Sequence, residues 1–219
     1  MPTWWEEIDA LYDRVYLGLR EGRVDTGDVV TLACHLVEYY GEGYDDPAVT
    51  EVVERDPATV PPREMSALAQ RILDATGYEP GLDLAPERAD VLREALAIAA
   101  GDLPDAWVAA GPPRIDIRPD SFPVTAKVLF ADGWMHGDGI SAGPPDDLVG
   151  ALVTVGEHLT ESVTERHWAV WPLCPEHRLG VHAARSAADG SAVWLCNGEP
   201  DGHPVARIGN LNSQLRDDN

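Results

Sequence analysis

The spacing of apolar residues changes once along the chain, and this change limits the fold more than any other feature. Up to about residue 101, apolar residues recur every three or four positions, as on one face of a helix. After the proline- and glycine-rich segment 109–113 they alternate with polar residues, as in half-buried strands. We therefore expect an α+β protein with an N-terminal helical bundle at 1-108 and a second domain at 109-219.

Five helices are predicted before the change of spacing. Each has an apolar stripe, and most have a capping residue at the start or a glycine at the end. Cys34 lies within the second helix, where we interpret it as a core residue. The short connections between the helices favour a compact bundle. The predicted helices cover about residues 3–22, 25–41, 46–57, 62–76 and 86–101.

The second part is predicted to contain a small antiparallel sheet with one covering helix. Residues 124–130 and 134–140 are rich in strand-forming side chains and flank the turn sequence Asp132-Gly133. The covering helix begins after Asp146 and Asp147, acids that favour a helix N-terminus. Its apolar stripe consists of Leu148, Leu152, Val155, Leu159 and Val163.

The last part of the chain contains two pairs of metal-capable side chains, Cys174 with His177 and Cys196 with His203. Two thiolates and two imidazoles form a tetrahedral donor set that suits zinc. The first pair has the spacing of a zinc knuckle, but the six residues between Cys196 and His203 exceed the usual two to five or so. His182 is a substitute for either histidine. Alternatively, both cysteines are buried thiols and the histidines are surface or capping groups.

From about residue 171, the tail carrying these four residues resembles a degenerate zinc-ribbon module. Such modules occur at the C-termini of acidic proteins from GC-rich bacterial genomes of actinomycete type. The resemblance covers about the last fifty residues and implies zinc as a cofactor, but no activity.

The net charge favours some partners over others. The chain has 16 Lys and Arg against 38 Asp and Glu, a formal charge of −22 at pH 7. A field of this sign repels nucleic acid and anionic lipid, so no direct nucleic-acid binding is expected. A basic protein partner is favoured instead. Alternatively, the acidity serves only solubility.

Cysteine usage and hydropathy indicate a cytoplasmic protein. Three cysteines do not form the even, dense framework of a small secreted domain. The segment Met1–Glu7 has neither the basic region nor the apolar run of a signal peptide. No apolar stretch approaches the length of a membrane span. The oligomeric state stays open.

No catalytic residue is predicted. The glycine-rich segment 137–143 lacks the lysine of a phosphate-binding loop, and neither a nucleophile elbow nor a His-Glu-x-x-His motif is present. His136 with Asp138, or Glu157 with His158, would form an acid–base pair, but each lacks a third member.

Four tryptophans, Trp4, Trp5, Trp168 and Trp171, are candidate interaction residues. Tryptophan is enriched at the energetic centres of protein interfaces. The alternative is that these rings close the edge of a core, as amphipathic aromatic side chains often do.

Two functional hypotheses follow. The first is a non-enzymatic acidic binding protein, an adaptor or an immunity-like inhibitor, that engages a basic protein partner. The alternative is a small zinc-dependent enzyme that uses the C-terminal Cys/His cluster. It ranks lower because four protein ligands leave zinc no open position for substrate or water.

Overall fold

The chain folds into two compact units, Met1–Pro80 and Gly81–Asn219. The computed structural model describes residues 4–41, 45–121, 123–137, 139–141, 147–200 and 202–212. Across these residues there are six α-helices and two antiparallel sheets, with about 50% helix and 14% strand. The predicted α+β class is confirmed. No helix in the described ranges is both long enough and apolar enough to cross a membrane.

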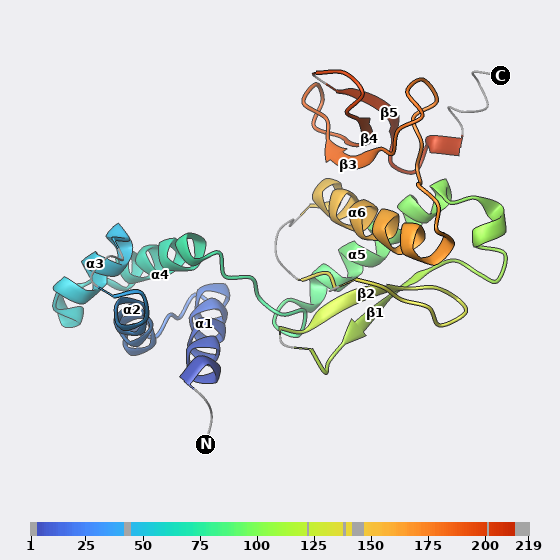
Figure 1. Ribbon diagram of the computed structural model, residues 1–219. Coiled ribbons are helices and arrows are strands. Elements are labelled where there is room, and N and C mark those ends of the chain that lie inside the picture. Colours follow the sequence, from blue (N-terminus) through green and yellow to red (C-terminus); the bar gives the residue numbers. More distant parts are fainter. Residues whose placement is uncertain are drawn as a thin grey trace. The chain divides into compact units, whose positions relative to one another are not determined.

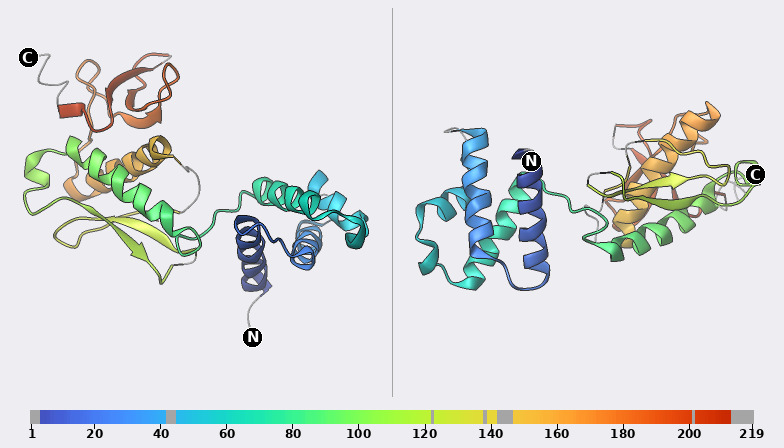
Figure 2. Two further views of the ribbon diagram at one scale, coloured as in Figure 1. Left: turned by 180° about the vertical axis from the view of Figure 1, so that it is seen from behind. Right: turned by 90° about the horizontal axis from the view of Figure 1, so that it is seen from below.

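The first unit is a helical bundle with its own core (Figures 1 and 2). Its helices are α1 (Trp4–Arg20), α2 (Thr26–Tyr40), α3 (Pro47–Glu54), the short 3-10 helix η1 (Pro57–Thr59) and α4 (Pro62–Thr76). The largest side chains that are fully buried in this core are Val15, Val29, Leu32, Val49, Met65, Leu68 and Ile72.

Local sequence accounts for where these helices begin and end. The carboxylate of Asp25 accepts a hydrogen bond from the N–H of Asp28 at 3.0 Å, and Asp46 caps α3 in the same way. Gly77 ends α4 in the left-handed conformation with φ +64°, which glycine adopts without steric cost. These starts and this stop agree with the predicted helix ranges, which start at about residues 25 and 46 and end at about residue 76.

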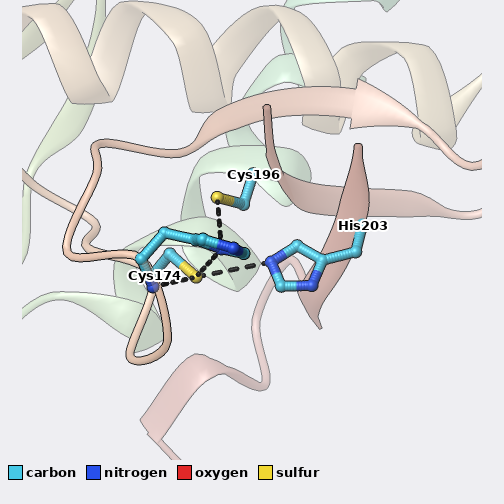
Figure 3. Close-up of side chains that lie close together, drawn as sticks. Cys174, Cys196 and His203 are labelled. Carbon is cyan, nitrogen blue, oxygen red and sulfur yellow. Dashed lines mark hydrogen bonds between the residues drawn. The ribbon is translucent and has the colours of Figure 1, made fainter. Parts of the chain in front are cut away.

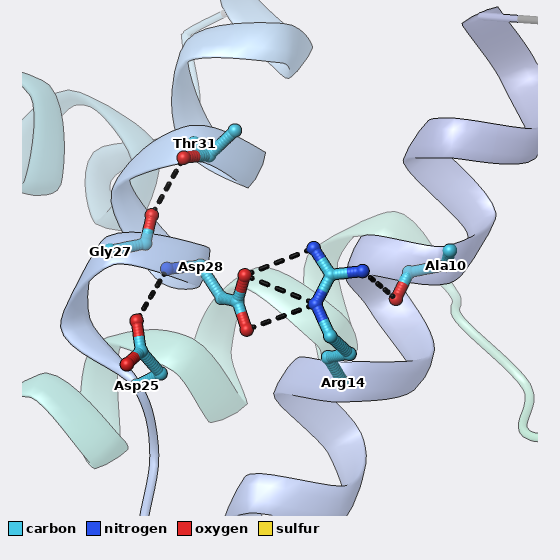
Figure 4. A network of polar contacts seen from close by, with 6 residues as sticks. All are labelled: Ala10, Arg14, Asp25, Gly27, Asp28 and Thr31. Atoms are coloured by element: carbon cyan, nitrogen blue, oxygen red, sulfur yellow. Dashed lines mark hydrogen bonds and ion pairs between the residues drawn. The ribbon is translucent and has the colours of Figure 1, made fainter.

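A side-chain network joins α1 to α2 (Figure 4). The guanidinium of Arg14 donates to the carboxylate of Asp28 at 3.0–3.1 Å and to the carbonyl oxygen of Ala10 at 3.1 Å. Because Arg14 is half exposed, such an ion pair contributes only about 0.2–1 kcal/mol. The network therefore fixes the register of the two helices more than it stabilises the bundle.

The second helix differs from its predicted pattern. Its buried residues are Val29, Leu32, Ala33 and Leu36, whereas Cys34 is exposed. Successive residues on a helix are rotated by about 100°, so Cys34 faces away from the stripe that contains Ala33. The interpretation of Cys34 as a core residue was wrong.

The second unit consists of three layers. In Figure 1, α6 lies between the sheet β3–β4–β5 on one side and α5 with the sheet β1–β2 on the other. Both sheets are antiparallel, and β4 is the central strand of the larger one. The elements are α5 (Pro86–Ala99), η2 (Ala100–Asp102), η3 (Asp105–Trp107), β1 (Arg114–Arg118), β2 (Thr125–Leu129), α6 (Leu148–His167), β3 (His182–Arg185), β4 (Ala192–Cys196) and β5 (His203–Arg207).

The boundary between the units lies between Pro80 and Gly81, not at the predicted 108/109. The fifth predicted helix, α5, packs against α6 and β1 and belongs to the second core. Trp107, next to the proline- and glycine-rich segment, stacks on His167 with 4.4 Å between ring centroids. An amphipathic stripe shows that one face of a helix is buried, but not which core covers that face. The change in the spacing of apolar residues therefore located the start of the sheet and not the boundary between the two units.

Asp102 is a buried carboxylate that holds the second unit together. It is 1% exposed and lies at the end of η2. Its oxygens accept hydrogen bonds from the indole N–H of Trp194 at 2.8 Å and from the backbone N–H groups of Gly209 and Leu211 at 2.6 and 2.7 Å. Burial raises the pKa of Asp102, and these three donors oppose that effect.

We expect residues 1–80, produced alone, to keep their helical circular dichroism and to unfold in one cooperative thermal transition, because their core is complete. A fragment of residues 1–108 is the matched control. It adds α5 without the elements that bury Leu92 and Leu96, so it should bind a hydrophobic dye. The division would be contradicted if residues 1–108 folded cooperatively and residues 1–80 did not.

Candidate metal centre

The first pair of candidate ligands lies on a tight hairpin. Leu173 forms a β-bridge with Gly180, and the N–H of Cys174 donates to the carbonyl oxygen of Leu179 at 2.8 Å. Arg178 takes the left-handed conformation, with φ 57°, and its N–H donates to the carbonyl oxygen of Cys174. This turn brings the ring of His177 back beside the Cys174 thiol.

The second pair is brought together by strand pairing. Cys196 is the last residue of β4, His203 is the first residue of β5, and the two are partners in the antiparallel register. The six residues between them form the connection of this strand pair. Six residues are more than a zinc knuckle usually has between its ligands. This length is nevertheless compatible with a metal site, because the pairing of the two strands positions Cys196 and His203.

The four side chains converge on one point, and Figure 3 shows the thiols of Cys174 and Cys196 with the ring of His203. All four ligand atoms lie within 4.8 Å of one another. The Nδ1 atom of His177 is 3.6 Å from each sulfur, and the Nε2 atom of His203 is 3.4 Å from the Cys174 sulfur. In a tetrahedral zinc site, Zn–S near 2.3 Å and Zn–N near 2.0 Å place sulfur and nitrogen about 3.5 Å apart. These three sulfur–nitrogen distances thus fit edges of such a site.

Each sulfur also accepts a backbone N–H. The donors are the N–H of His177 to Cys174 at 3.5 Å and the N–H of Gly198 to Cys196 at 3.4 Å. Donors of this kind stabilise a thiolate more than a neutral thiol, and the thiolate is the form that binds metal. The backbone N–H in the turn after each cysteine therefore favours the thiolate form of that cysteine.

The acid–base properties of the group agree with this arrangement. Burial raises the pKa of the Cys174 thiol, but hydrogen bonds with His177 and His203 outweigh it and lower the pKa to about 6. The hydrogen bond with Cys174 raises the pKa of His203. Burial raises the pKa of the Cys196 thiol, so the Cys174 thiol ionises more readily than the Cys196 thiol.

Two further residues complete the site, and sequence reasoning did not single them out. One is Glu176, whose carboxylate lies 3.9 Å from Nδ1 of His203, the ring nitrogen that faces away from Cys174. A carboxylate in this place favours the ring orientation that directs Nε2 at a metal. Its position between Cys174 and His177 in the sequence was the available signal.

The other is Gly198. A Cβ atom at this position would lie 2.5 Å from Cγ of His177 and 2.8 Å from its Nδ1. Real Cβ atoms essentially never come within 3.0 Å of another heavy atom, so only glycine lets the imidazole occupy its place. Gly198 both donates to Cys196 and makes room for His177.

The remaining predicted residues are distributed as follows. His182 is on β3 opposite Leu195 and is not among the four converging residues. Trp171 is buried, with its ring 5.4 Å from that of Trp194, whereas Trp168 is 89% exposed. Trp4 and Trp5 begin α1, but their side chains lie outside what the structure describes.

Cys174, His177, Cys196 and His203 therefore lie close enough to hold a metal ion. Both thiols are fully buried. Within the described ranges, no other group of three or more His, Cys, Asp or Glu side chains converges in this way.

The comparisons with known proteins add no relative: no protein-family model, no curated protein and no solved structure matches this chain.

Proposed function

We propose that the chain is a non-enzymatic acidic binding protein whose second unit is stabilised by a structural zinc ion and whose partner is a basic protein. The observation that carries the proposal is the set of two buried thiols and two imidazoles, in which three sulfur–nitrogen distances of 3.4–3.6 Å match edges of a tetrahedral zinc site. Such a set gives the metal a role in folding.

The chemistry of the donors supports zinc over other ions. Two sulfur and two imidazole ligands in a tetrahedral arrangement suit zinc, while calcium and magnesium prefer oxygen ligands. Zinc bound here would join the hairpin at 173–180 to β4 and β5.

Binding is favoured over catalysis because four protein ligands leave zinc no position for water or substrate. The enzyme alternative requires one ligand to leave. His203 is the candidate, since its side chain is partly exposed beside the more exposed Glu176. Zinc-dependent hydrolysis that persists in a His203→Ala protein would favour that alternative.

The charge supports a basic partner. Met1–Pro80 contains 17 acidic and 6 basic residues, and Gly81–Asn219 contains 21 and 10, so each unit carries −11. A field of one sign over both units accelerates the capture of an oppositely charged protein. An adaptor or an immunity-like inhibitor would use it in this way.

We also assign the protein to the cytoplasm, where thiols stay reduced and able to bind metal.

Affinity capture at two salt concentrations tests the binding function. The full chain should retain a protein of pI above about 9 at about 50 mM salt and lose most of it at about 500 mM, because salt screens charge–charge attraction. Retention that does not depend on salt, or no retained basic protein, would leave solubility as the better explanation of the acidity.

Gly198→Ala is expected to weaken zinc binding by about tenfold or more, because the new methyl group displaces the His177 ring. Competition with a chromogenic zinc chelator measures the change. Gly101→Ala is the matched control, since its Cβ would meet nothing within 4 Å. Equal zinc affinities for the two variants would mean that His177 is not a ligand.

A further inference from the structure

Large apolar side chains are exposed in the stretch of chain that carries the first pair of candidate ligands. Trp168 is 89% exposed, and Val170, Leu173 and Leu179 are each about half exposed. These four residues, here called the knuckle patch, lie within one stretch of twelve residues that also contains Cys174 and His177. In the second unit they are the large hydrophobic residues most exposed to solvent among those described.

Three of the four are held together by the hairpin that carries the first pair of ligands. Leu173 bridges Gly180, and Leu179 accepts the hydrogen bond of the Cys174 N–H. Val170 lies against this hairpin, because its Cγ1 atom is 2.9 Å from where a Cβ atom of Gly180 would stand. Trp168 precedes Val170 by two residues. A metal that fixes Cys174 and His177 would thus also fix the hairpin side of the patch.

Trp168 has an unusual backbone for its size. It caps the C-terminus of α6 in the left-handed conformation, with φ 50° and ψ 39°. This conformation disfavours bulky side chains, and glycine is the common residue at such a cap. The ring is also almost fully exposed, so burial within the described fold does not offset the unfavourable backbone. Both observations favour a contact of this side chain with a surface outside the second unit.

We propose that the knuckle patch is the docking site for the basic protein partner, and that Trp168 is its central contact. This inference rests on the proposed binding function and locates it on the second unit. The charge of the chain selects the occupant. A second copy would bring another −22, and nucleic acid or an anionic membrane would also be repelled.

The surroundings of the patch fit a basic chain that carries apolar anchors. Glu165 and Glu176 are exposed, one in the last turn of α6 and the other at the tip of the hairpin. Arg166 and Arg178 are the Lys or Arg residues of segment 165–180, and the guanidinium of Arg166 is paired with the carboxylate of Asp132 at 2.7 Å. The face of an exposed indole also attracts a lysine or arginine side chain. Apolar side chains of the partner would cover Leu173 and Leu179, while its cations meet the carboxylates and the indole.

Site-specific photo-cross-linking tests the proposal. A benzophenone amino acid replaces Trp168 in the full chain, with the same replacement of Tyr39, an exposed aromatic residue of the first unit, as the matched control. Irradiation in cells should join position 168, but not position 39, to a protein of pI above about 9. The identified partner is then purified, and its affinity for Trp168→Ala should be at least about tenfold weaker than for the wild type, with Tyr39→Ala unchanged.

Several results would overturn the docking site: no adduct at position 168, an adduct of two copies of this chain, an adduct with an acidic protein, or undiminished affinity of Trp168→Ala for the purified partner. Zinc analysis of the same preparations separates this failure from failure of the proposed function. If a basic partner binds Trp168→Ala as well as it binds the wild type, the docking site at the knuckle patch is rejected and the proposed binding function stands. If the chain contains no zinc and still cross-links at position 168, the zinc site is rejected and the docking site stands.

Discussion

Replacing Cys174 or Cys196 with serine is expected to abolish zinc binding and to unfold much of Gly81–Asn219, while Met1–Pro80 stays folded. The reason is that both cysteines belong to the same continuous core as α5, α6 and Trp194, so a zinc ion bound to them would support the whole second unit. A ligand that binds only the folded state at about 1,000 times its Kd stabilises that state by about 4 kcal/mol. A loss of this size is a large part of the stability of a small domain.

Metal analysis and thermal unfolding measure these two effects. The wild type, purified without tags or chelators, should carry about one zinc per chain. It should also show two unfolding transitions, of which a strong chelator lowers only one. Cys34→Ser and His182→Ala are the matched controls, because neither residue belongs to the converging group. A wild-type protein without zinc would end the metal hypothesis and leave Cys174 and Cys196 as core thiols.

The second large effect is expected at Asp102. Asp102→Ala leaves the indole N–H of Trp194 and the N–H groups of Gly209 and Leu211 without their acceptor. Since this carboxylate is buried, we expect the second unit to lose about 3–5 kcal/mol of unfolding free energy. Chemical denaturation measures the loss. Asp105→Ala, an exposed neighbour on η3, should leave the unfolding free energy nearly unchanged. Equal unfolding free energies of the two variants would show that the hydrogen bonds of Asp102 do not stabilise the second unit.

Asp102 also predicts a dependence on pH. Burial raises its pKa in the folded state above the ordinary value of 3.8. A carboxyl with a raised folded pKa stabilises the fold fully below its ordinary pKa and loses that contribution as pH rises through the folded value. Asp102→Asn cannot ionise, so its destabilisation relative to the wild type should shrink as pH rises from about 4. A difference that grows with pH would contradict the assigned direction.

The parts of the fold that depend on neighbouring residues could be predicted from the sequence. Asp25 and Asp46 lie directly before the helices that they cap, and Gly77 lies directly after the helix that it ends. The four residues that converge were also found, because thiols and imidazoles are rare enough in this chain for two close pairs to stand out.

The parts that depend on distant residues could not be predicted. Asp102 directly follows the predicted helix 86–101, and nothing local indicates that its partners are Trp194 and Leu211. The same limit explains the misplaced boundary: the stripe of α5 is as consistent with one core as with the other. The pairing of β4 with β5, which made the long interval between Cys196 and His203 compatible with a site, is likewise non-local.

The hydrogen bonds of Asp102 have a consequence for how the chain folds as it is made. They connect residues 92, 107 and 109 positions apart, and the last donor is Leu211. On the ribosome, Met1–Pro80 can fold as soon as it emerges, since its contacts lie within itself. The second unit must wait with α5 and α6 exposed until Leu211 has been synthesised. During that interval its apolar helices are open to chaperones, and to aggregation where chaperones are scarce.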